Sequence, residues 1–379
     1  MALFPKKNNS ETQQKAPAQE PEPDGEQTPS TGEDRVDVIG IDIGFGFTKA
    51  VKDHNTIIFK SILGEAAEIQ YTEALLEEAE KDEFLHVEFD GAAHFVGELA
   101  ERQSNVRFFT LDQGQFVSRF ARPLALTAIG RLATAHVPVN LVTGLPIGHY
   151  RQHKEEFAKM LTGKHTITII SRDGSREEKS ININKVLVVP QPFGSLFDTM
   201  LTDEGKLKDK RFLQEKIGVI DVGFRTCDYT VSDKMRYSER GSRTTESGIA
   251  RGFNIIASKL REKSGVNVEL YRLYEAVEKG SIKIRGQEFD LKSLIEQVFK
   301  QLATTIANEI DRLWADDWDM DAMIVTGGGG KVLEPFLKSQ LTGEILPAPD
   351  PEDDPRFRNV RGYGKYGRYK WGTATISEE

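Results

Sequence analysis

The chain has 379 residues, of which 38% are hydrophobic, and a formal net charge of −9. This length allows two domains that each bury a core. The negative charge excludes a protein whose whole surface binds nucleic acid, because phosphate neutralisation needs clustered Lys and Arg, although it leaves a local basic patch open. No run approaches the ~18 apolar residues of a membrane span, and the N-terminus lacks the apolar segment of a signal peptide.

The cysteine and histidine content favours a reducing, cytoplasmic location. Cys227 is the single cysteine, which excludes an internal disulfide, and the seven histidines show no zinc-site spacing. Residues 1–34 contain seven acidic residues, five prolines and one aromatic residue. Such a segment cannot bury enough apolar surface to offset chain entropy. We therefore expect a disordered arm, either a solubilising tail or a tether for a partner.

Order is predicted to begin at Val36. The runs VDVIGIDIG, TKAVKD and TIIFKSIL predict three consecutive antiparallel strands, the first turn being rich in glycine. An acidic, helix-like stretch is expected at 73–83, and short strands near 85–89 and 95–97. A long amphipathic segment follows at 116–135.

Strands then alternate with helices, which indicates the α/β class. NLVTGLP and KVLVVPQP have the composition of buried strands, with an amphipathic helix between them and the helical PFGSLFDTML after them. At Lys216 the early pattern begins again, because KIGVIDVGFRTCDYTVSD is another strand, glycine turn and strand. The chain is therefore predicted to be internally duplicated, with a cleft for a ligand between two similar halves.

The second half is predicted to continue with three helices, a buried strand and a further helix. The helices are expected at 249–263, 270–279 and 291–314. The strand is AMIVTGG, and the last helix is expected to begin near Val332.

Two hairpins half a chain apart carry the same chemistry. Asp42 and Asp221 each end a strand that is followed by a glycine turn and a returning strand. Backbone N–H groups of such turns can point at phosphate oxygens, carboxylates suit Mg²⁺ or its waters, and Lys49 adds a positive charge. One such hairpin is most simply a tight turn, but its repetition favours a phosphate site.

The glycine run at 327–330 follows the buried strand and is expected to enter a helix. Backbone without side chains can lie there against a flat base or a phosphate. The run is not a Walker A loop, because Val325 stands at the position of that motif's first glycine and Val332 follows Lys331. By itself it is equally compatible with a flexible connection.

Four motifs stand in the order of the phosphate-1, connect-1, phosphate-2 and adenosine motifs of the actin superfamily. They are DIGFGFTK, VVPQPFGSLFD, VIDVGFRTCD and MIVTGGGGKVLEP. The chain resembles this superfamily from residue 36 to about 371. Together with DGAAHFVGELAERQS and NVRGYGKYG, these motifs are most similar to the ParM-like plasmid-segregation actins of bacteria and archaea.

This resemblance implies an α/β, actin-like (ribonuclease H-like) fold with duplicated domains around a nucleotide cleft. Domain I would comprise 35–215, with 355–379 packing back on it as a C-terminal helix, and domain II would comprise 216–354. The implied function is a cytoplasmic ATPase that binds ATP·Mg²⁺, forms head-to-tail filaments with itself and moves DNA or another cargo through an adaptor protein.

Site residues follow from the matching positions. The resemblance implies that Asp42 and Asp221 hold Mg²⁺ through waters and that Gln191 orients the attacking water; these three are the predicted catalytic residues. The implied ATP/ADP-binding residues are Gly44, Phe45, Gly46, Thr48, Lys49, Gly223, Phe224, Arg225, Thr226, Gly252, Gly327, Gly328, Gly329 and Lys331. Of these, Gly252 and the glycines at 327–329 would face the adenosine.

Three residues depart from the superfamily pattern. Phe45 stands where actin has serine, so that the hydroxyl contact to the γ-phosphate is lost or is replaced by Thr48 or a backbone amide. Phe224 replaces the usual second glycine of phosphate-2, and Arg225 follows it. Arg225 is expected to face solvent or, alternatively, to reach a phosphate. Cys227 is expected to be a small buried side chain, not a reactive thiol.

Residues 356–370 hold six basic and four aromatic residues and no acidic ones. This composition resembles a nucleic-acid patch, but the family ends in a similar helix, and a basic helical face can simply be solvated. We therefore expect neither strong direct nucleic-acid binding nor membrane attachment, since the N-terminal arm is acidic and rich in proline.

One alternative keeps the fold and drops the polymer: a nucleotide-gated regulator or scaffold. A small-molecule kinase is disfavoured because no catalytic carboxylate stands near connect-1, and a chaperone because no substrate domain follows the core. The sequence does not determine the cargo, the form of the filament or the choice between ATP and GTP.

Overall fold

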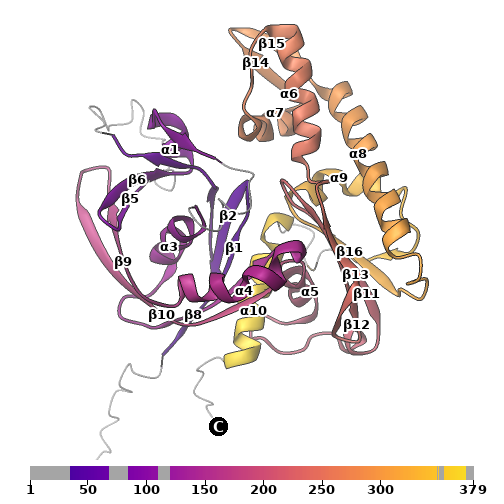
Figure 1. Cartoon of the computed structure of the whole chain (residues 1–379), viewed down its shortest axis with the longest axis horizontal. Helices are drawn as coiled ribbons and strands as arrows, with labels where there is room; N and C mark the ends of the chain where they lie inside the picture. The colour runs from indigo at the N-terminus through magenta and orange to yellow at the C-terminus, as the bar shows by residue number, and fades with distance from the viewer. Residues whose placement is uncertain (1–34, 68–83, 110–119, 348, 350–353, 373–379) are drawn as a thin grey trace, which may run out of the picture. The chain divides into compact units, whose positions relative to one another are not determined.

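The computed structural model describes residues 35–67, 84–109, 120–347, 349 and 354–372 (Figure 1). The arm predicted at 1–34 and the acidic helix predicted at 73–83 lie outside these residues. The three antiparallel strands predicted after Val36 are confirmed. None of the helices in the described part of the chain is both long and apolar enough to cross a membrane.

A ten-stranded mixed sheet occupies the first half, in the order β3-β2-β1-β8-β10-β9-β5-β6-β4-β7. Its core consists of β8, parallel to both β1 and β10, and buried along its whole length, as an apolar central strand should be. The sequence missed β9, which pairs antiparallel with the long β10. The strands are β1 Asp37–Ile43, β2 Phe47–Lys52, β3 Asn55–Lys60, β4 Leu63–Glu65, β5 Leu85–Phe89, β6 Ala92–Val96, β7 Arg107–Phe108, β8 Val139–Leu145, β9 Gly163–Ile170 and β10 Arg176–Pro190.

Helices cover this sheet on both faces. The long segment predicted at 116–135 contains a shorter helix, α3, which is buried at nine of its twelve positions because it packs on β1, β2 and β9 of the sheet. The four helices are α1 Glu98–Gln103, α3 Ala121–Leu132, α4 Ile147–Leu161 and α5 Phe193–Met200.

A five-stranded sheet in the second half repeats the central arrangement of the first, as the duplicated pattern predicted. The β11–β12 hairpin lies beside the parallel β16, just as β1–β2 lies beside β8. The order is β13-β12-β11-β16-β17. The strands are β11 Lys216–Val222, β12 Cys227–Asp233, β13 Arg236–Thr245, β16 Ala322–Thr326 and β17 Glu344–Ile345. The predicted domain boundary at 215/216 falls between β10 and β11 and stays a prediction.

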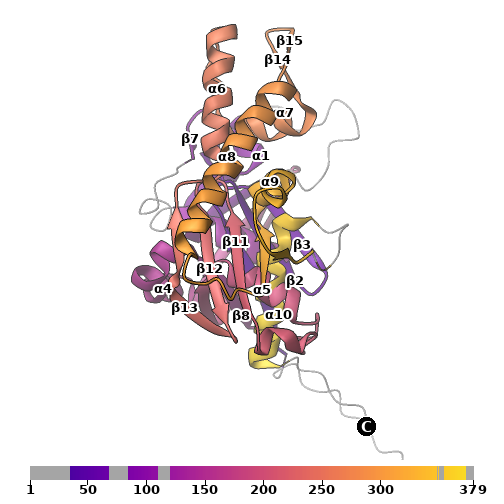
Figure 2. The same cartoon turned by 90° about the vertical axis from the view of Figure 1, so that its right-hand side faces the viewer.

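The helices of the second half follow the predicted order with one correction. The last of them, α9, begins at Gly328 and not near Val332, because Gly327 turns the chain with a φ of 87° and caps the helix. A hairpin that the sequence did not predict, β14 Ser281–Ile284 and β15 Gln287–Asp290, stands beside α7 (Figure 2). The helices are α6 Ala250–Ser264, α7 Leu273–Lys279, α8 Lys292–Leu313 and α9 Gly328–Lys338, with 3₁₀ turns η3 Lys210–Leu213, η4 Leu270–Arg272 and η5 Pro355–Phe357.

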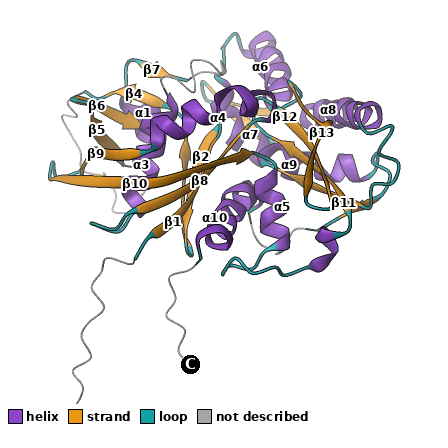
Figure 3. Cartoon of the chain, turned by 60° about the horizontal axis from the view of Figure 1, so that its bottom comes forward, coloured by secondary structure: helices purple, strands orange, loops and turns teal. Residues whose placement is uncertain are grey.

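The C-terminal helix α10, Arg358–Trp371, packs on α5, β1 and β8 (Figure 3). Glycine allows this close approach: a Cβ on Gly362 would overlap the carbonyl oxygen of Gly194 in α5. The basic residues of this helix were expected to face solvent, and this expectation is wrong for three of them. Arg358, Lys365 and Arg368 are buried, and the Lys365 ammonium lies 2.9 Å from the Asp198 carboxylate.

Candidate functional site

A cavity between the two repeated hairpins gathers most of the predicted site residues. The turn after β1 lines one side, and the turn after β11 and the start of α9 line the other. The predicted residues that line it are Asp42, Gly44, Phe45, Gly46, Lys49, Gln191, Asp221, Gly223, Phe224, Arg225, Thr226, Gly327, Gly328, Gly329 and Lys331.

Asp42 lies at the end of β1 with its carboxylate held from two sides. It is buried, and its cross-strand neighbour in β2 is Lys49. The Lys49 ammonium donates to one carboxylate oxygen at 2.7 Å, and Gln191 Nε2 donates to the other at 3.2 Å. The predicted water-positioning residue and the predicted cation therefore meet on one carboxylate, although they are 142 residues apart in the sequence.

Asp221 occupies the equivalent position at the end of β11. It is fully buried, and Asn359 Nδ2 at the start of α10 donates to it at 2.6 Å. Burial, together with the nearby Asp228 and Asp42 carboxylates, raises the pKa of Asp221 from 3.8 to about 7. A cation between the two hairpins would favour the ionised form, so the site is electrostatically suited to one.

The phosphate-1 turn is held from behind by Ser61. Its hydroxyl donates to Gly44 O at 2.6 Å, and its backbone N–H donates to Gly46 O at 3.0 Å. Thr48 does not line the cavity, since its hydroxyl is buried and hydrogen-bonds to Ser61 Oγ at 3.0 Å. Thr48 or a backbone amide was expected to replace the γ-phosphate contact that a serine makes in actin. Because Thr48 does not reach the cavity, the backbone amides remain as the replacement.

The phosphate-2 turn is held by the start of α6. The backbone N–H groups of 248–250 donate to the carbonyls of Arg225, Gly223 and Phe224 at 2.8–3.1 Å. The Phe224 ring turns away from the strand into an aromatic cluster with Phe253 and Tyr274, which explains how a bulky residue is accommodated in this turn.

Arg225 lines the cavity and remains partly exposed. Its guanidinium lies 5.5 Å from the centre of the Phe45 ring, across the cleft, and Nη2 donates to Glu246 at 3.0 Å. The other terminal nitrogen, Nη1, is buried without a hydrogen-bond partner in the described part of the chain. The Arg225 side chain is 27% exposed, so the choice between a solvent-facing and a phosphate-binding arginine stays a prediction. A cation is nevertheless present where the two phosphate turns face each other.

The glycines at 327–329 bring backbone to the cavity wall. Gly327 cannot carry a side chain, because a Cβ would overlap both Asp221 and the carbonyl of Val222, and its φ is positive. The N–H groups that begin α9 follow directly, and a helix N-terminus attracts negative charge. Gly252, by contrast, lies outside the cavity, where it packs against Val298 and Phe299 of α8.

Sequence reasoning missed several residues of the site. Asn359, Tyr274 and Arg356 line the cavity, and Asp228 lies behind the phosphate-2 turn. Asp228 accepts from Thr226 Oγ1 at 3.1 Å and from the backbone N–H of Ile147 at 2.9 Å, which joins the turn to the start of α4. The run NVRGYGKYG contained a signal for Asn359, but the helix had no predicted position relative to the cleft.

This repeated sheet architecture, with two aspartates and two glycine turns facing one cleft, defines an actin-like fold. The family model "Actin like proteins N terminal domain" matches residues 40–194, and "Archaeal actin homologue MreB-like, C-terminal" matches 219–339. Together these matches cover more than half of the chain, and the chain belongs to the actin-like proteins, as the motifs indicated.

Solved structures agree with this assignment. A non-polymerisable quadruple mutant of pCBH ParM has 27% sequence identity and a TM-score of 0.73, over 88% of this chain and 99% of that one. A 15-stranded ParM filament from Clostridium botulinum has 26% identity and a TM-score of 0.72 over the same shares. An archaeal actin homologue in complex with ADP has 20% identity and a TM-score of 0.71, over 86% and 98%. No curated protein matches the chain in sequence.

Proposed function

We propose that this protein is an ATPase that binds ATP·Mg²⁺ in the cleft between the repeated hairpins and assembles with itself into filaments. The observation that carries the proposal is the pairing of Asp42 and Asp221, one buried carboxylate from each hairpin, at a single cavity whose walls are glycine turns. This is the arrangement that a charged phosphate chain and a bridging cation require.

The polyphosphate would lie between the two turns. Backbone N–H groups of the turn at 44–46 and of the turn at 223–226 would face its oxygens, while Lys49 and Arg225 supply positive charge from opposite sides. The glycines at 327–329 let backbone approach the nucleoside end, where Lys331 and Tyr274 also line the cavity. Phe45 contributes no hydroxyl, and its ring instead packs beneath the Arg225 guanidinium.

The two buried carboxylates would be the protein groups that hold the metal ion. Asp42 and Asp221 would hold Mg²⁺ through waters, since Mg²⁺ prefers hard oxygen ligands and retains part of its hydration shell. The ion would neutralise charge on the transferred phosphoryl group. Asn359 orients the Asp221 carboxylate through the bond to Nδ2, while Ser195 Oγ donates to Asn359 Oδ1 at 2.7 Å.

Gln191 would orient the attacking water. Its amide cannot act as a strong base, so its contribution is positional, which suits a reaction that depends mainly on alignment and electrostatic stabilisation. The residue is held at its backbone, where the Tyr363 hydroxyl donates to Gln191 O at 2.9 Å. The rate of hydrolysis would therefore depend on how the two halves of the cleft meet. Assembly that closes the cleft would accelerate hydrolysis.

Self-association is supported by the similar ParM that was solved as a filament. Two different surfaces of one chain that bind each other repeat without closing and form an open polymer. In the cytoplasm, such a filament could position DNA or another cargo through an adaptor. The second candidate is a regulator or scaffold with the same cleft and no polymer.

Sedimentation and electron microscopy with ATP, with ADP and without nucleotide test the proposal, with phosphate release measured in parallel. We expect filaments and phosphate release with ATP, and neither in Asp221→Ala. ATP turnover without filaments would favour the regulator. A protein that binds no nucleotide at all would contradict both candidates.

A further inference from the structure

The loop that joins α8 to β16, residues 314–321, presents Trp318 to solvent. This residue is 87% exposed, more than any other large hydrophobic residue in the described part of the chain. A tryptophan offers one of the largest burial gains of any side chain, and it is enriched among the residues that dominate binding interfaces. An indole held in water therefore indicates a contact surface.

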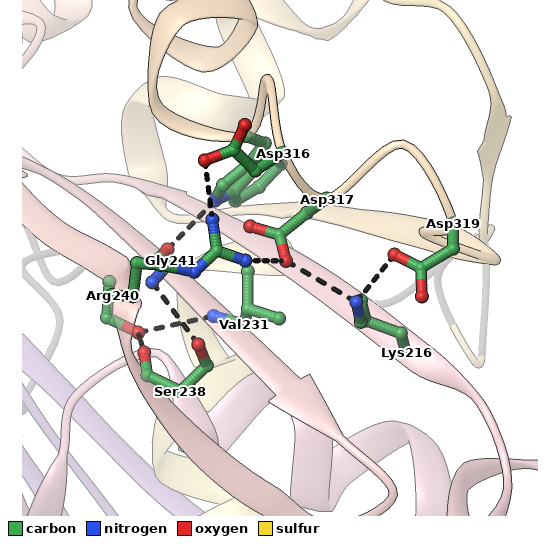
Figure 4. Close-up of polar contacts among 10 residues, drawn as sticks. Lys216, Val231, Ser238, Arg240, Gly241, Asp316, Asp317 and Asp319 are labelled. Carbon is green, nitrogen blue, oxygen red and sulfur yellow. Dashed lines mark hydrogen bonds and ion pairs between the residues drawn. The ribbon is translucent and has the colours of Figure 1, made fainter.

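Ion pairs hold the residues on either side of Trp318 (Figure 4). Asp317 is buried; its Oδ1 accepts from Arg240 Nη2 at 2.6 Å and from Lys216 Nζ at 3.4 Å. The same lysine donates to Asp319 Oδ1 at 2.5 Å. The ion pair between Asp317 and two cations fixes the backbone just before the indole, and the bond to Asp319 fixes it just after.

The ends of the loop are anchored as well. Trp314 is buried, and its Nε1 donates to Gly241 O at 2.8 Å. At the other end, the backbone N–H of Asp321 donates to Lys216 O at 2.9 Å, and Asp321 Oδ2 accepts from the Lys216 backbone N–H at 2.8 Å. The exposed indole thus stands on a fixed platform, and binding would lose little conformational entropy there.

Acidic side chains surround the indole and define the partner's charge. The Asp316 side chain is 87% exposed and lies 3.4 Å from Arg240 Nη1, and the Asp319 side chain, bound to Lys216, is 51% exposed. The loop contains four aspartates against these two cations, so it keeps an excess of negative charge. A complementary surface therefore needs an apolar residue flanked by cations.

The outer face of α6 has this pattern. Ile255 is 38% exposed on a helix that buries its other face, so it offers an apolar contact to a partner. Arg251 and Lys259 are exposed one helical turn before and after it, so that the three form one row. Lys259 pairs with Glu262 at 2.8 Å, but basic residues still outnumber this acid on the exposed positions of the helix, which also include Arg261 and Lys263.

The two surfaces cannot meet within one chain. Gly252, one turn before Ile255, packs on Phe299 in α8, and the loop begins at Trp314, fifteen residues further along the same helix. At 1.5 Å per residue this separation is about 22 Å.

We infer that the 314–321 loop of one copy binds the α6 face of a second copy of this chain, Trp318 packing on Ile255 while Asp316 and Asp319 face Arg251 and Lys259. Because the two surfaces differ, the contact is head-to-tail and repeats without closing. The inference rests on the proposed filament and names the contact that would build it.

The test compares nucleotide-driven assembly of the full chain across two matched substitutions. Trp318→Ala should raise the critical concentration for assembly about 25-fold, which corresponds to the loss of about 2 kcal/mol at one contact. Tyr369→Ala on α10 is the control, because it removes another aromatic ring that is 58% exposed. This substitution should change the critical concentration less than about twofold. Nucleotide affinity, measured by calorimetry, should stay unchanged in both.

A charge exchange tests the partner surface. Asp316→Lys and Arg251→Glu should each weaken assembly, and the double variant should assemble better than either single one. If Trp318→Ala assembled at the same critical concentration as the wild type, the inferred contact would be overturned, whereas the proposed filament would not be. Failure of the double variant to recover would overturn α6 as the partner surface. A wild-type protein that binds nucleotide but never assembles would overturn both the contact and the filament.

Discussion

Replacing Gly362 by alanine should separate α10 from α5, whereas the same change at Gly364, two residues along the same helix, should not. A Cβ at Gly362 would overlap the Gly194 carbonyl oxygen and lie 2.6 Å from its carbon and 2.8 Å from Asp198 N. All three are backbone atoms of α5, so no side-chain rotation relieves the overlap. At Gly364 the nearest atom is a Val51 methyl group at 3.3 Å, which needs to move only a few tenths of an ångström.

Both substitutions gain about 1 kcal/mol of helix propensity, so the difference between them isolates the packing effect. Overpacking a rigid contact costs about 1–3 kcal/mol, and a backbone neighbour places Gly362→Ala at the upper end. We expect Gly362→Ala to be about 3 kcal/mol less stable than Gly364→Ala, which is a difference of roughly 5 °C in Tm for a chain of this size.

Thermal unfolding and nucleotide titration of the two variants provide the measurement. Nucleotide affinity should also fall in Gly362→Ala, because α10 carries Asn359 to the Asp221 carboxylate. Equal melting temperatures for the two variants would refute the reasoning, since they would mean that α10 does not pack at backbone distance on α5.

Three further outcomes are expected. Because the pKa of Asp221 is raised from 3.8 to about 7 in the folded chain, the ligand-free protein should lose about 3 kcal/mol of stability as the pH rises from 4 to 7. Asp221→Asn should remove that part of the pH dependence in denaturant unfolding, and parallel pH profiles for the two proteins would contradict this. Gln191→Ala should slow phosphate release on the order of 100-fold with little change in nucleotide affinity by calorimetry, and an equal loss of affinity would make Gln191 a binding residue. Arg225→Ala should weaken binding of a non-hydrolysable ATP analogue at least about tenfold more than binding of ADP, whereas equal losses would place its guanidinium away from the terminal phosphate.

Local features of the sequence were sufficient for most elements and for the centre of the candidate site. Strand, glycine turn and returning strand are adjacent in the chain, so Asp42 and Asp221 could be assigned to strand ends without knowledge of the tertiary structure. The pairing of Asp42 with Lys49 follows from the same hairpin, because a short turn sets the register between its strands. Repetition of this pattern predicted the duplicated sheets.

Short elements with weak patterns were missed or misplaced. The strand β9 mixes buried and exposed positions, and its pairing with β10 is decided across the sheet. The start of α9 was predicted four residues late because four glycines oppose a helix by propensity. Gly252 stands near the start of a helix, as expected, but the face that it presents depends on where α8 packs.

The sequence by itself determined the class of fold, the two aspartates and the glycine turns, because each depends on residues that are neighbours in the chain. Only the tertiary structure decided that Asn359 meets Asp221 across 138 residues, that Arg225 lines the cleft and that three basic residues of α10 are buried. These contacts depend on how closely helices and sheets approach. That distance is set by packing among distant side chains and by glycines that permit backbone contact.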